Sequence, residues 1–124
     1  MSASIEETEE LRPRFGADGL LTAMVEDADS AETLMLAHMN AEALDATLST
    51  GVATFWSRSR AELWTKGATS GNVLRVAEVL VDCDQDAVLL RVRIEGDGVA
   101  CHTGRRSCFY RAIDPASRTL TERD

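Results

Sequence analysis

A strict two-residue alternation near the C-terminal third of the chain constrains the fold more than any other feature of the sequence. In the segment AVLLRVRIEGDG, residues 87–98, Leu90, Val92 and Ile94 would share one face of an extended chain. Arg91 and Arg93 would share the opposite face. This pattern predicts a strand that ends in a turn at residues 96–98.

Other segments carry the same signal, because they are short, apolar and rich in Val, Thr, Phe and Trp. The longest of them changes the phase of its alternation near Ala77, which predicts an irregularity in that strand. The predicted strands are residues 19–27, 33–40, 52–57, 62–67, 72–84 and a short last strand at 108–113, with a polar turn at 58–61.

One segment instead has the spacing of a helix. Asn40 is a good N-cap residue, Leu44 and Leu48 lie four residues apart, and Gly51 stands where a helix often ends. We predict a helix over residues 41–49. Together the elements predict an α+β fold with a mostly antiparallel sheet and one or two short helices.

The 124 residues, of which 44% are hydrophobic, fit one domain with a real core. We expect residues 1–12 to be an acidic, flexible segment, residues 13–115 to form the domain, and residues 116–124 to be a tail. No apolar run is long enough for a membrane span, and the N-terminus lacks the features of a secretory signal, so we expect a cytoplasmic protein with reduced cysteines. The net charge of −8 argues against a nucleic-acid partner, while local basic segments suit a small anionic ligand.

Three aspartates alternate in VDCDQDAV. In an extended segment Asp82, Asp84 and Asp86 would share one face and repel one another unless a cation lay between them, which indicates a Mg²⁺ site. An exposed acidic strand end is the alternative. A calcium loop of the EF-hand type does not fit, because Ala87 and Arg93 stand where that loop needs Gly and Glu.

The chain has three cysteines, Cys83, Cys101 and Cys108. Three thiolates and one open position are typical of a catalytic zinc site, whereas three unlinked thiols are the alternative. In an extended segment Cys83 would point away from the aspartates, so the sequence indicates two separate sites or a site completed by another subunit. A disulfide between Cys101 and Cys108 is not expected in a reducing compartment.

The two histidines are expected to have different roles. His102 adjoins Cys101 and could be a fourth ligand, a general base or a loop residue; its side chain would point away from that of Cys101, which favours a base or proton shuttle. His38 lies in an apolar segment and is expected to be a satisfied core histidine.

Both tryptophans lie within residues 55–72, among hydroxyl and basic side chains. Indole rings stack on bases, and Arg, Lys and Ser bind phosphates, so the segment favours a nucleotide site over a merely polar hairpin. The basic pair that follows Cys101 would supply a second anion contact. The predicted substrate contacts are Trp56, Ser57, Arg58, Lys66, Ser70, Arg105 and Arg106.

The segments WSRSRAELWTKGATSG, DCDQD and CHTGRRSCF, in this order, resemble the phosphoribosyl-AMP cyclohydrolases of histidine biosynthesis. The resemblance covers residues 34–111. It implies an obligate homodimer with an α+β fold. It also implies a zinc site that combines Cys101 and Cys108 with Cys83 of the partner chain, and Mg²⁺ on Asp82, Asp84 and Asp86.

The activity implied is zinc-dependent opening of the adenine ring of 1-(5-phosphoribosyl)-AMP at the N1–C6 bond, with His102 as the proton-transfer candidate. The sequence departs from the family at Asn72, where His is frequent, and at His38, where Tyr is common. Another zinc-dependent nucleotide hydrolase or deaminase is the alternative, although the deaminase motifs H-x-E and P-C-x-x-C are absent. A non-enzymatic module stabilised by zinc would need neither the aspartates nor the Trp–Arg segment.

Overall fold

The computed structural model describes residues 4–123, and its centre is a four-stranded sheet with the strand order β2-β1-β6-β5. The strands are β1 (Leu21–Asp27), β2 (Thr33–Met39), β5 (Leu74–Val81) and β6 (Ala87–Ile94). β1 pairs antiparallel with β2, and β5 pairs antiparallel with β6. The two central strands, β1 and β6, run parallel. The alternation in residues 87–94 therefore marks a strand at the centre of the sheet.

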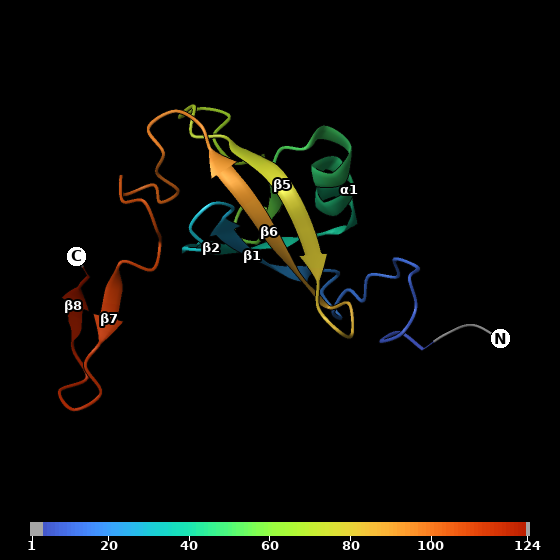
Figure 1. The fold of residues 1–124 in the computed structure, drawn as a ribbon, viewed down its shortest axis with the longest axis horizontal. Helices are drawn as coiled ribbons and strands as arrows, with labels where there is room; N and C mark the ends of the chain where they lie inside the picture. The colour runs from blue at the N-terminus through green and yellow to red at the C-terminus, as the bar shows by residue number, and fades with distance from the viewer. Residues whose placement is uncertain (1–3, 124) are drawn as a thin grey trace.

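One face of the sheet is covered by α1 (Ala41–Thr50) and by the hairpin of β3 (Thr54–Ser57) and β4 (Glu62–Thr65). Alternate residues of β1 and β6 point into this layer and are almost fully buried together with Phe55 of β3. Figure 1 shows α1 beside the sheet, while the C-terminal hairpin lies apart from it at the other end of the molecule. That hairpin consists of β7 (Arg111–Ile113) and β8 (Leu120–Glu122), and all six of its residues are exposed.

Local signals in the sequence predicted the helix closely. The Oδ1 atom of Asn40 accepts a hydrogen bond from the amide of Ala43 at 2.8 Å, and Gly51 ends the helix with φ 75°. Thr47 connects the helix to the hairpin, because its hydroxyl contacts the carbonyl of Thr54 and accepts from the amide of Thr54. The predicted irregularity at Ala77 is confirmed as a register shift between Val76 and Glu78.

The strand predicted over residues 72–84 is too long, because β5 ends at Val81. Residues 82–86 form a turn in which Gln85 has φ 61°, and the amide of Gln85 donates to the carbonyl of Asp82. The last strand is shorter than predicted, and β8 was not predicted at all. α1 is the single helix within residues 4–123, so no second helix accompanies it there.

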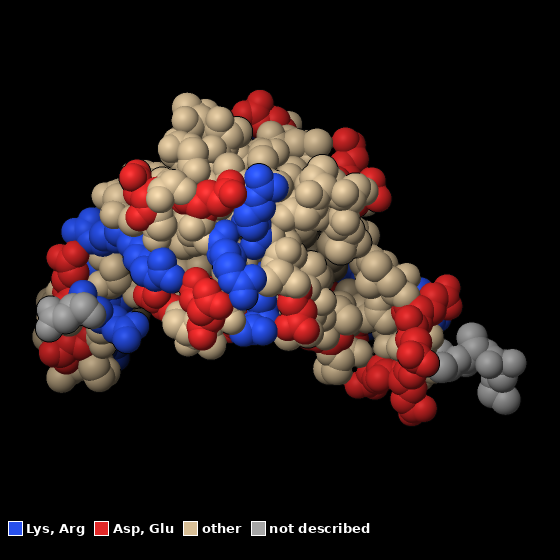
Figure 2. All heavy atoms as spheres, turned by 45° about the horizontal axis from the view of Figure 1, so that its top comes forward, with Lys and Arg blue, Asp and Glu red and all other residues tan. Residues whose placement is uncertain are grey.

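The expected division into residues 1–12, 13–115 and 116–124 stays a prediction, although β8 lies within the expected tail and pairs with β7. In residues 4–12 the chain turns and is hydrogen-bonded to the body through Gln85, whereas residues 1–3 and Asp124 lie outside the described part. Figure 2 shows acidic side chains gathered beside the N-terminal end, and basic side chains interspersed with acidic ones over the middle. No helix in the described part of the chain is long and apolar enough to cross a membrane.

Candidate active site

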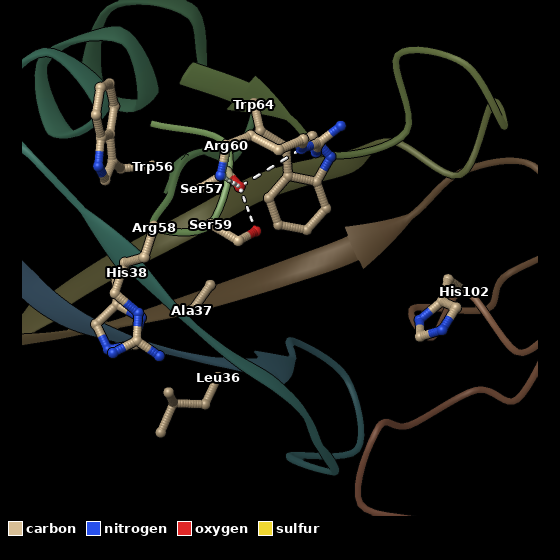
Figure 3. A pocket seen from close by; sticks show the side chains of 10 residues that line it. All are labelled: Leu36, Ala37, His38, Trp56, Ser57, Arg58, Ser59, Arg60, Trp64 and His102. Carbon is tan, nitrogen blue, oxygen red and sulfur yellow. Dashed lines mark hydrogen bonds between the residues drawn. The ribbon is translucent and has the colours of Figure 1, made fainter. Parts of the chain in front are cut away.

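A wide hollow of about 850 Å³ opens between β2, the β3–β4 turn and the loop that follows β6. Three elements far apart in the sequence line it, and Figure 3 shows their side chains around the open space. The lining residues are Leu36, Ala37 and His38 from β2, Trp56, Ser57, Arg58, Ser59, Arg60 and Trp64 from the hairpin, and His102 from the loop.

The tight turn at residues 58–61 directs polar side chains of the hairpin into this hollow. The hydroxyl of Ser57 accepts a hydrogen bond from the amide of Arg60 at 3.3 Å, and Ala61 has φ 51°. Of the predicted substrate contacts, Trp56, Ser57 and Arg58 line the hollow, whereas Lys66, Ser70 and the Arg105–Arg106 pair lie outside its lining.

The two tryptophans do not face each other. Trp56 pairs with Leu63 and Trp64 pairs with Phe55 across the hairpin, so neighbouring positions place the two indoles on opposite faces. The ring centroid of Trp64 lies 5.5 Å from that of Phe55, at the edge of the core. Figure 3 shows the two indoles well separated. A base could therefore stack on one of them, but not between them.

His38 is not the core histidine that the sequence suggested. It is half-buried on the uncovered face of β2 and lines the hollow, and Figure 3 places its ring beside Arg58. Partial burial and the positive charge of Arg58 lower the pKa of His38. A neutral imidazole at this position can accept a proton or a hydrogen bond at neutral pH.

Cys101 and Cys108 come together in the loop after β6. The amide of Cys101 donates to the carbonyl of Arg105 at 3.0 Å, and the amide of Cys108 donates to the carbonyl of Leu34 at 2.7 Å. These bonds close the loop and dock it on β2, so that the two sulfur atoms interact directly. Cys101 is buried and Cys108 is exposed.

The two thiols differ in acidity. Burial acts to raise the pKa of Cys101, but hydrogen bonds from the hydroxyl and amide of Thr103 outweigh it, and the net pKa is lowered. Burial, together with the charge of Cys101, raises the pKa of Cys108 to about 11. Lys66, which is buried at 8% exposure, favours the thiolate at both cysteines through its positive charge. A cation bound between the sulfurs would remove the penalty on the second thiolate.

The hydroxyl of Thr103 lies 3.0 Å from the Sγ atom of Cys101, a contact that the sequence did not point out. The one feature of the sequence that could have pointed to Thr103 is its position two residues after the candidate ligand Cys101.

Cys83 lies in the β5–β6 turn, at the opposite end of β6 from the other two cysteines. The seven steps along β6 alone span roughly 23 Å at the usual rise of a strand. Within residues 4–123 the only group of three or more potential metal ligands is the aspartate trio, so one protomer does not assemble the three cysteines.

The aspartates do come together, but for a different reason from the predicted alternation. Ligand oxygens of Asp82, Asp84 and Asp86 lie within 4.8 Å of one another because the chain turns there. The Oδ1 atom of Asp82 accepts from the amides of Asp86 and Ala87, at 3.0 and 3.2 Å.

Two of the three carboxyl groups, Asp82 and Asp86, have shifted pKa values. Burial acts to raise the pKa of Asp82, but hydrogen bonds from Asp86 and Ala87 outweigh it and the net pKa is lowered. Side-chain hydrogen bonds with Asp84 and Asp82 raise the pKa of Asp86 to about 6. Clustered carboxylate oxygens are the ligands that a hard divalent cation such as Mg²⁺ prefers.

Asn72 has a structural role in this chain. It is buried, and its Oδ1 atom accepts a hydrogen bond from the amide of Asp97 at 2.8 Å. The hydroxyl of Ser70 in turn accepts from the amide of Asn72 at 3.2 Å. The segment around Ser70 is thereby tied to the turn at residues 96–98.

The arginine pair after Cys101 is engaged in ion pairs within the protomer. The Nε atom of Arg105 lies 2.6 Å from Glu122, and that of Arg106 lies 2.7 Å from Glu32. The guanidinium of Arg105 also lies 4.1 Å from the ring centroid of Tyr110. Both arginines line a second, smaller hollow of about 520 Å³.

The two thiols could hold a soft metal ion, and the indole and guanidinium groups of the hollow could hold the base and phosphate of a nucleotide, so the fold and site suit an enzyme that acts on nucleotides. A family model described as phosphoribosyl-AMP cyclohydrolase matches residues 35–110, and the chain belongs to this family.

Curated relatives carry the same name. The phosphoribosyl-AMP cyclohydrolase of Chelativorans sp. (strain BNC1) is 60% identical over 111 residues, which are 90% of this chain and 80% of the relative. That of Brucella anthropi is 61% identical over 110 residues, 89% of this chain and 78% of the relative. That of Brucella canis is 59% identical over 110 residues, 89% of this chain and 79% of the relative. The resemblance carried by the sequence motifs is therefore confirmed.

Proposed function

We propose that this protein opens the adenine ring of 1-(5-phosphoribosyl)-AMP by hydrolysis of the N1–C6 bond. The product is the 5-[(5-phosphoribosylamino)methylideneamino]imidazole carboxamide nucleotide, a step of L-histidine biosynthesis. The observation that carries the proposal, beside the family match, is the pair of interacting thiols next to a hollow with imidazole and cationic groups.

Cys101 and Cys108 of one protomer, with Cys83 of a second, would hold a zinc ion with one position left open. The donor set fits, because soft thiolates prefer zinc and because three protein ligands are the pattern of catalytic sites. Bound there, zinc would supply a water molecule that loses its proton near neutral pH.

The protein's own residues would direct the reaction. Water adds to C6, the N1–C6 bond breaks, and N1 takes up a proton, so that no ammonia leaves. His102, in the hollow and next to Cys101, is our candidate for delivering that proton to N1. Trp56, Ser57 and Arg58 would hold the base and one phosphate.

The second phosphate needs other partners. Lys66, Ser70, Arg105 and Arg106 are the proposed contacts, and the two arginines would exchange Glu122 and Glu32 for the phosphate. We assign Mg²⁺ to Asp82, Asp84 and Asp86. A cytoplasmic location fits this chemistry, since zinc binding requires three free thiols.

The proposed partner is a second copy of the chain, and the uncovered face of the sheet supports this. Leu36, Met24, Leu89 and Leu80 stand in register across all four strands on that face. Leu36 and Leu80 are 45% and 43% exposed. Leu36 also lines the hollow, so a copy that covers this apolar row would reach the active site and could bring its Cys83 there.

The test is an absorbance assay of ring opening with the pure nucleotide, with and without a chelator, combined with an ammonia assay. We expect turnover that stops with chelator, returns with Zn²⁺ and releases no ammonia. Turnover that resists removal of all bound metal would contradict the zinc assignment, and release of ammonia would identify a deaminase instead.

A further inference from the structure

Gln85 belongs to the β5–β6 turn, yet its side chain binds the beginning of the chain. Gln85 is 5% exposed, and its Oε1 atom accepts a hydrogen bond from the amide of Arg12 at 2.7 Å. Its Nε2 atom donates to the carbonyls of Glu10 and Ile5, at 3.2 and 3.4 Å. The acceptor and the donor of this buried amide thus both face the N-terminal segment.

A backbone bond and an apolar contact strengthen the attachment. The carbonyl of Gln85 accepts from the amide of Arg14 at 2.7 Å. Leu11 and Pro13 line a narrow groove together with Leu44 of α1 and Val79 of β5. We call residues 5–14 the strap, since they are fastened across the end of the sheet at these points.

The strap fixes a turn whose backbone is otherwise unfavourable. Gln85 has φ 61°, in the left-handed region where the Cβ atom of a residue with a side chain comes too close to the backbone. The hydrogen bonds to the strap hold it there. Cys83 lies two residues before Gln85 on the same turn, so its position depends on the conformation that the strap holds.

We propose that the strap and Gln85 together position Cys83 for its metal site in the neighbouring protomer. This rests on the proposed function, which makes Cys83 a zinc ligand. Residues that orient a ligand without touching the metal typically change metal affinity by about 10–100-fold. The strap lies outside residues 35–110, the part matched by the family model.

Two substitutions at one position isolate the main bond. Arg12→Pro removes the amide hydrogen that Gln85 binds, whereas Arg12→Ala keeps it and removes only the side chain. Gln85→Ala removes the side chain that accepts this hydrogen bond. The double variant Arg12→Pro/Gln85→Ala tests whether the two substitutions act through the same contact. Glu9→Gln, an exposed change on the strap, is a further control.

Two readouts are needed, of which one is independent of metal. Hydrogen exchange in the metal-free protein reports the turn through the amides of Gln85 and Asp86, which bind Asp82. We expect these amides to exchange at least tenfold faster in Arg12→Pro and Gln85→Ala than in Arg12→Ala. Zinc affinity, measured against a chromophoric chelator, should fall about tenfold in the same two variants, with Tm unchanged within a few degrees and the double variant no worse than either.

Equal exchange in Arg12→Pro and Arg12→Ala would overturn the proposal. Faster exchange with unchanged zinc affinity would also overturn it, since the turn would then be ordered without positioning Cys83. A wild-type protein that binds no zinc would refute the proposed function, and with it the role of the strap toward zinc, while the exchange data would still decide whether the strap holds the turn. If Gln85→Ala does not fold, the comparison of Arg12→Pro with Arg12→Ala still tests the proposal, because both variants keep Gln85.

Discussion

The Nη2 atom of Arg106 lies 3.0 Å from the Oδ1 atom of Asp27, and this ion pair ties the cysteine loop to the end of β1. The other carboxylate oxygen of Asp27 accepts from the amides of Asp29 and Ser30 and from the hydroxyl of Ser30. One buried carboxylate therefore holds both the β1–β2 turn and the loop that carries the thiols.

This ion pair makes stability depend on pH in a defined window. Burial acts to raise the pKa of Asp27, but the bonds from Ser30 and Asp29 and the charge of Arg106 outweigh it, so the pKa in the folded protein is lowered. The stabilisation is thus complete above the ordinary value of 3.8 and is lost as the pH falls through the lowered value. We expect Asp27→Asn to reduce the urea midpoint at pH 7 and to differ little from wild type near pH 2. Asp45→Asn, at an exposed position on α1, should leave the midpoint unchanged at both pH values.

Two glycines in the segment KGATSG permit a matched comparison. Gly67 and Gly71 have φ 86° and 83°, so alanine is strained at both. A Cβ atom at Gly67 would approach the backbone of Asn72 and Val73 to 2.4 Å, whereas at Gly71 it would meet open space. We expect Gly71→Ala to cost about 1–2 kcal/mol and Gly67→Ala about 1–3 kcal/mol more, as measured by urea unfolding. Equal costs would show that the backbone at residues 72–73 yields to the methyl group.

The sequence predicted those parts of the structure that local interactions determine. Asn40 and Gly51 bound the helix through contacts a few residues apart, and the phase shift at Ala77 appears as a bulge. The parallel pairing of β1 with β6 could not be found in this way, since it depends on where distant segments pack. The sequence does not predict the turn at residues 82–86, because the side chain of Gln85 has its partners in the distant N-terminal segment.

The structure brings together some of the residues that the sequence indicates for the site, but in arrangements that the sequence does not predict. The Asp trio gathers as expected, although through a turn, and Cys101 meets Cys108. The opposite orientation of the two tryptophans follows from the register of the hairpin, which residue spacing alone does not determine. The place of His38 on the open face of β2 depended on which face α1 covers.

The zinc assignment predicts that loss of one cysteine removes both the metal and the activity. Cys101→Ser should abolish both zinc binding and turnover, because the oxygen of serine is a poor replacement for a thiolate. Metal content by elemental analysis and the ring-opening assay provide the measurement. Ser107→Ala, in the same loop, removes the hydroxyl that donates to the carbonyl of Thr33 and should keep the zinc. A Cys101→Ser protein with full activity and no metal would refute the zinc role.

Sharing of ligands between protomers can be tested by mixing inactive variants. A heterodimer of Cys83→Ser with Cys101→Ser chains contains one intact site, so equal mixing after unfolding and refolding should restore about a quarter of wild-type turnover. Cys101→Ser mixed with Cys108→Ser is the control, since both changes damage the same side of the site and no intact site forms. Absence of recovery in the first mixture would exclude shared ligands.

The two histidines of the hollow are expected to differ in their effect on rate. His102→Ala should retain zinc but lose about 10²–10⁴-fold in kcat, the usual contribution of a general acid or base. His38→Gln keeps a polar side chain on β2 and should change kcat by less than about tenfold. Wild-type turnover in His102→Ala would remove this residue from the mechanism, and a large loss in His38→Gln would transfer the proton-transfer role to His38.

The parallel pairing of the two central strands has a consequence for biosynthesis of the chain. β1 ends at Asp27, but the strand that pairs with it in the middle of the sheet begins only at Ala87. During translation β1 and β2 can form their hairpin early, yet its inner edge stays unpaired until most of the polypeptide has left the ribosome. Contacts of such long sequence separation slow folding, and an unpaired edge invites association with other nascent chains. Expression yield should therefore respond more strongly to chaperone supply than the small size of the protein suggests.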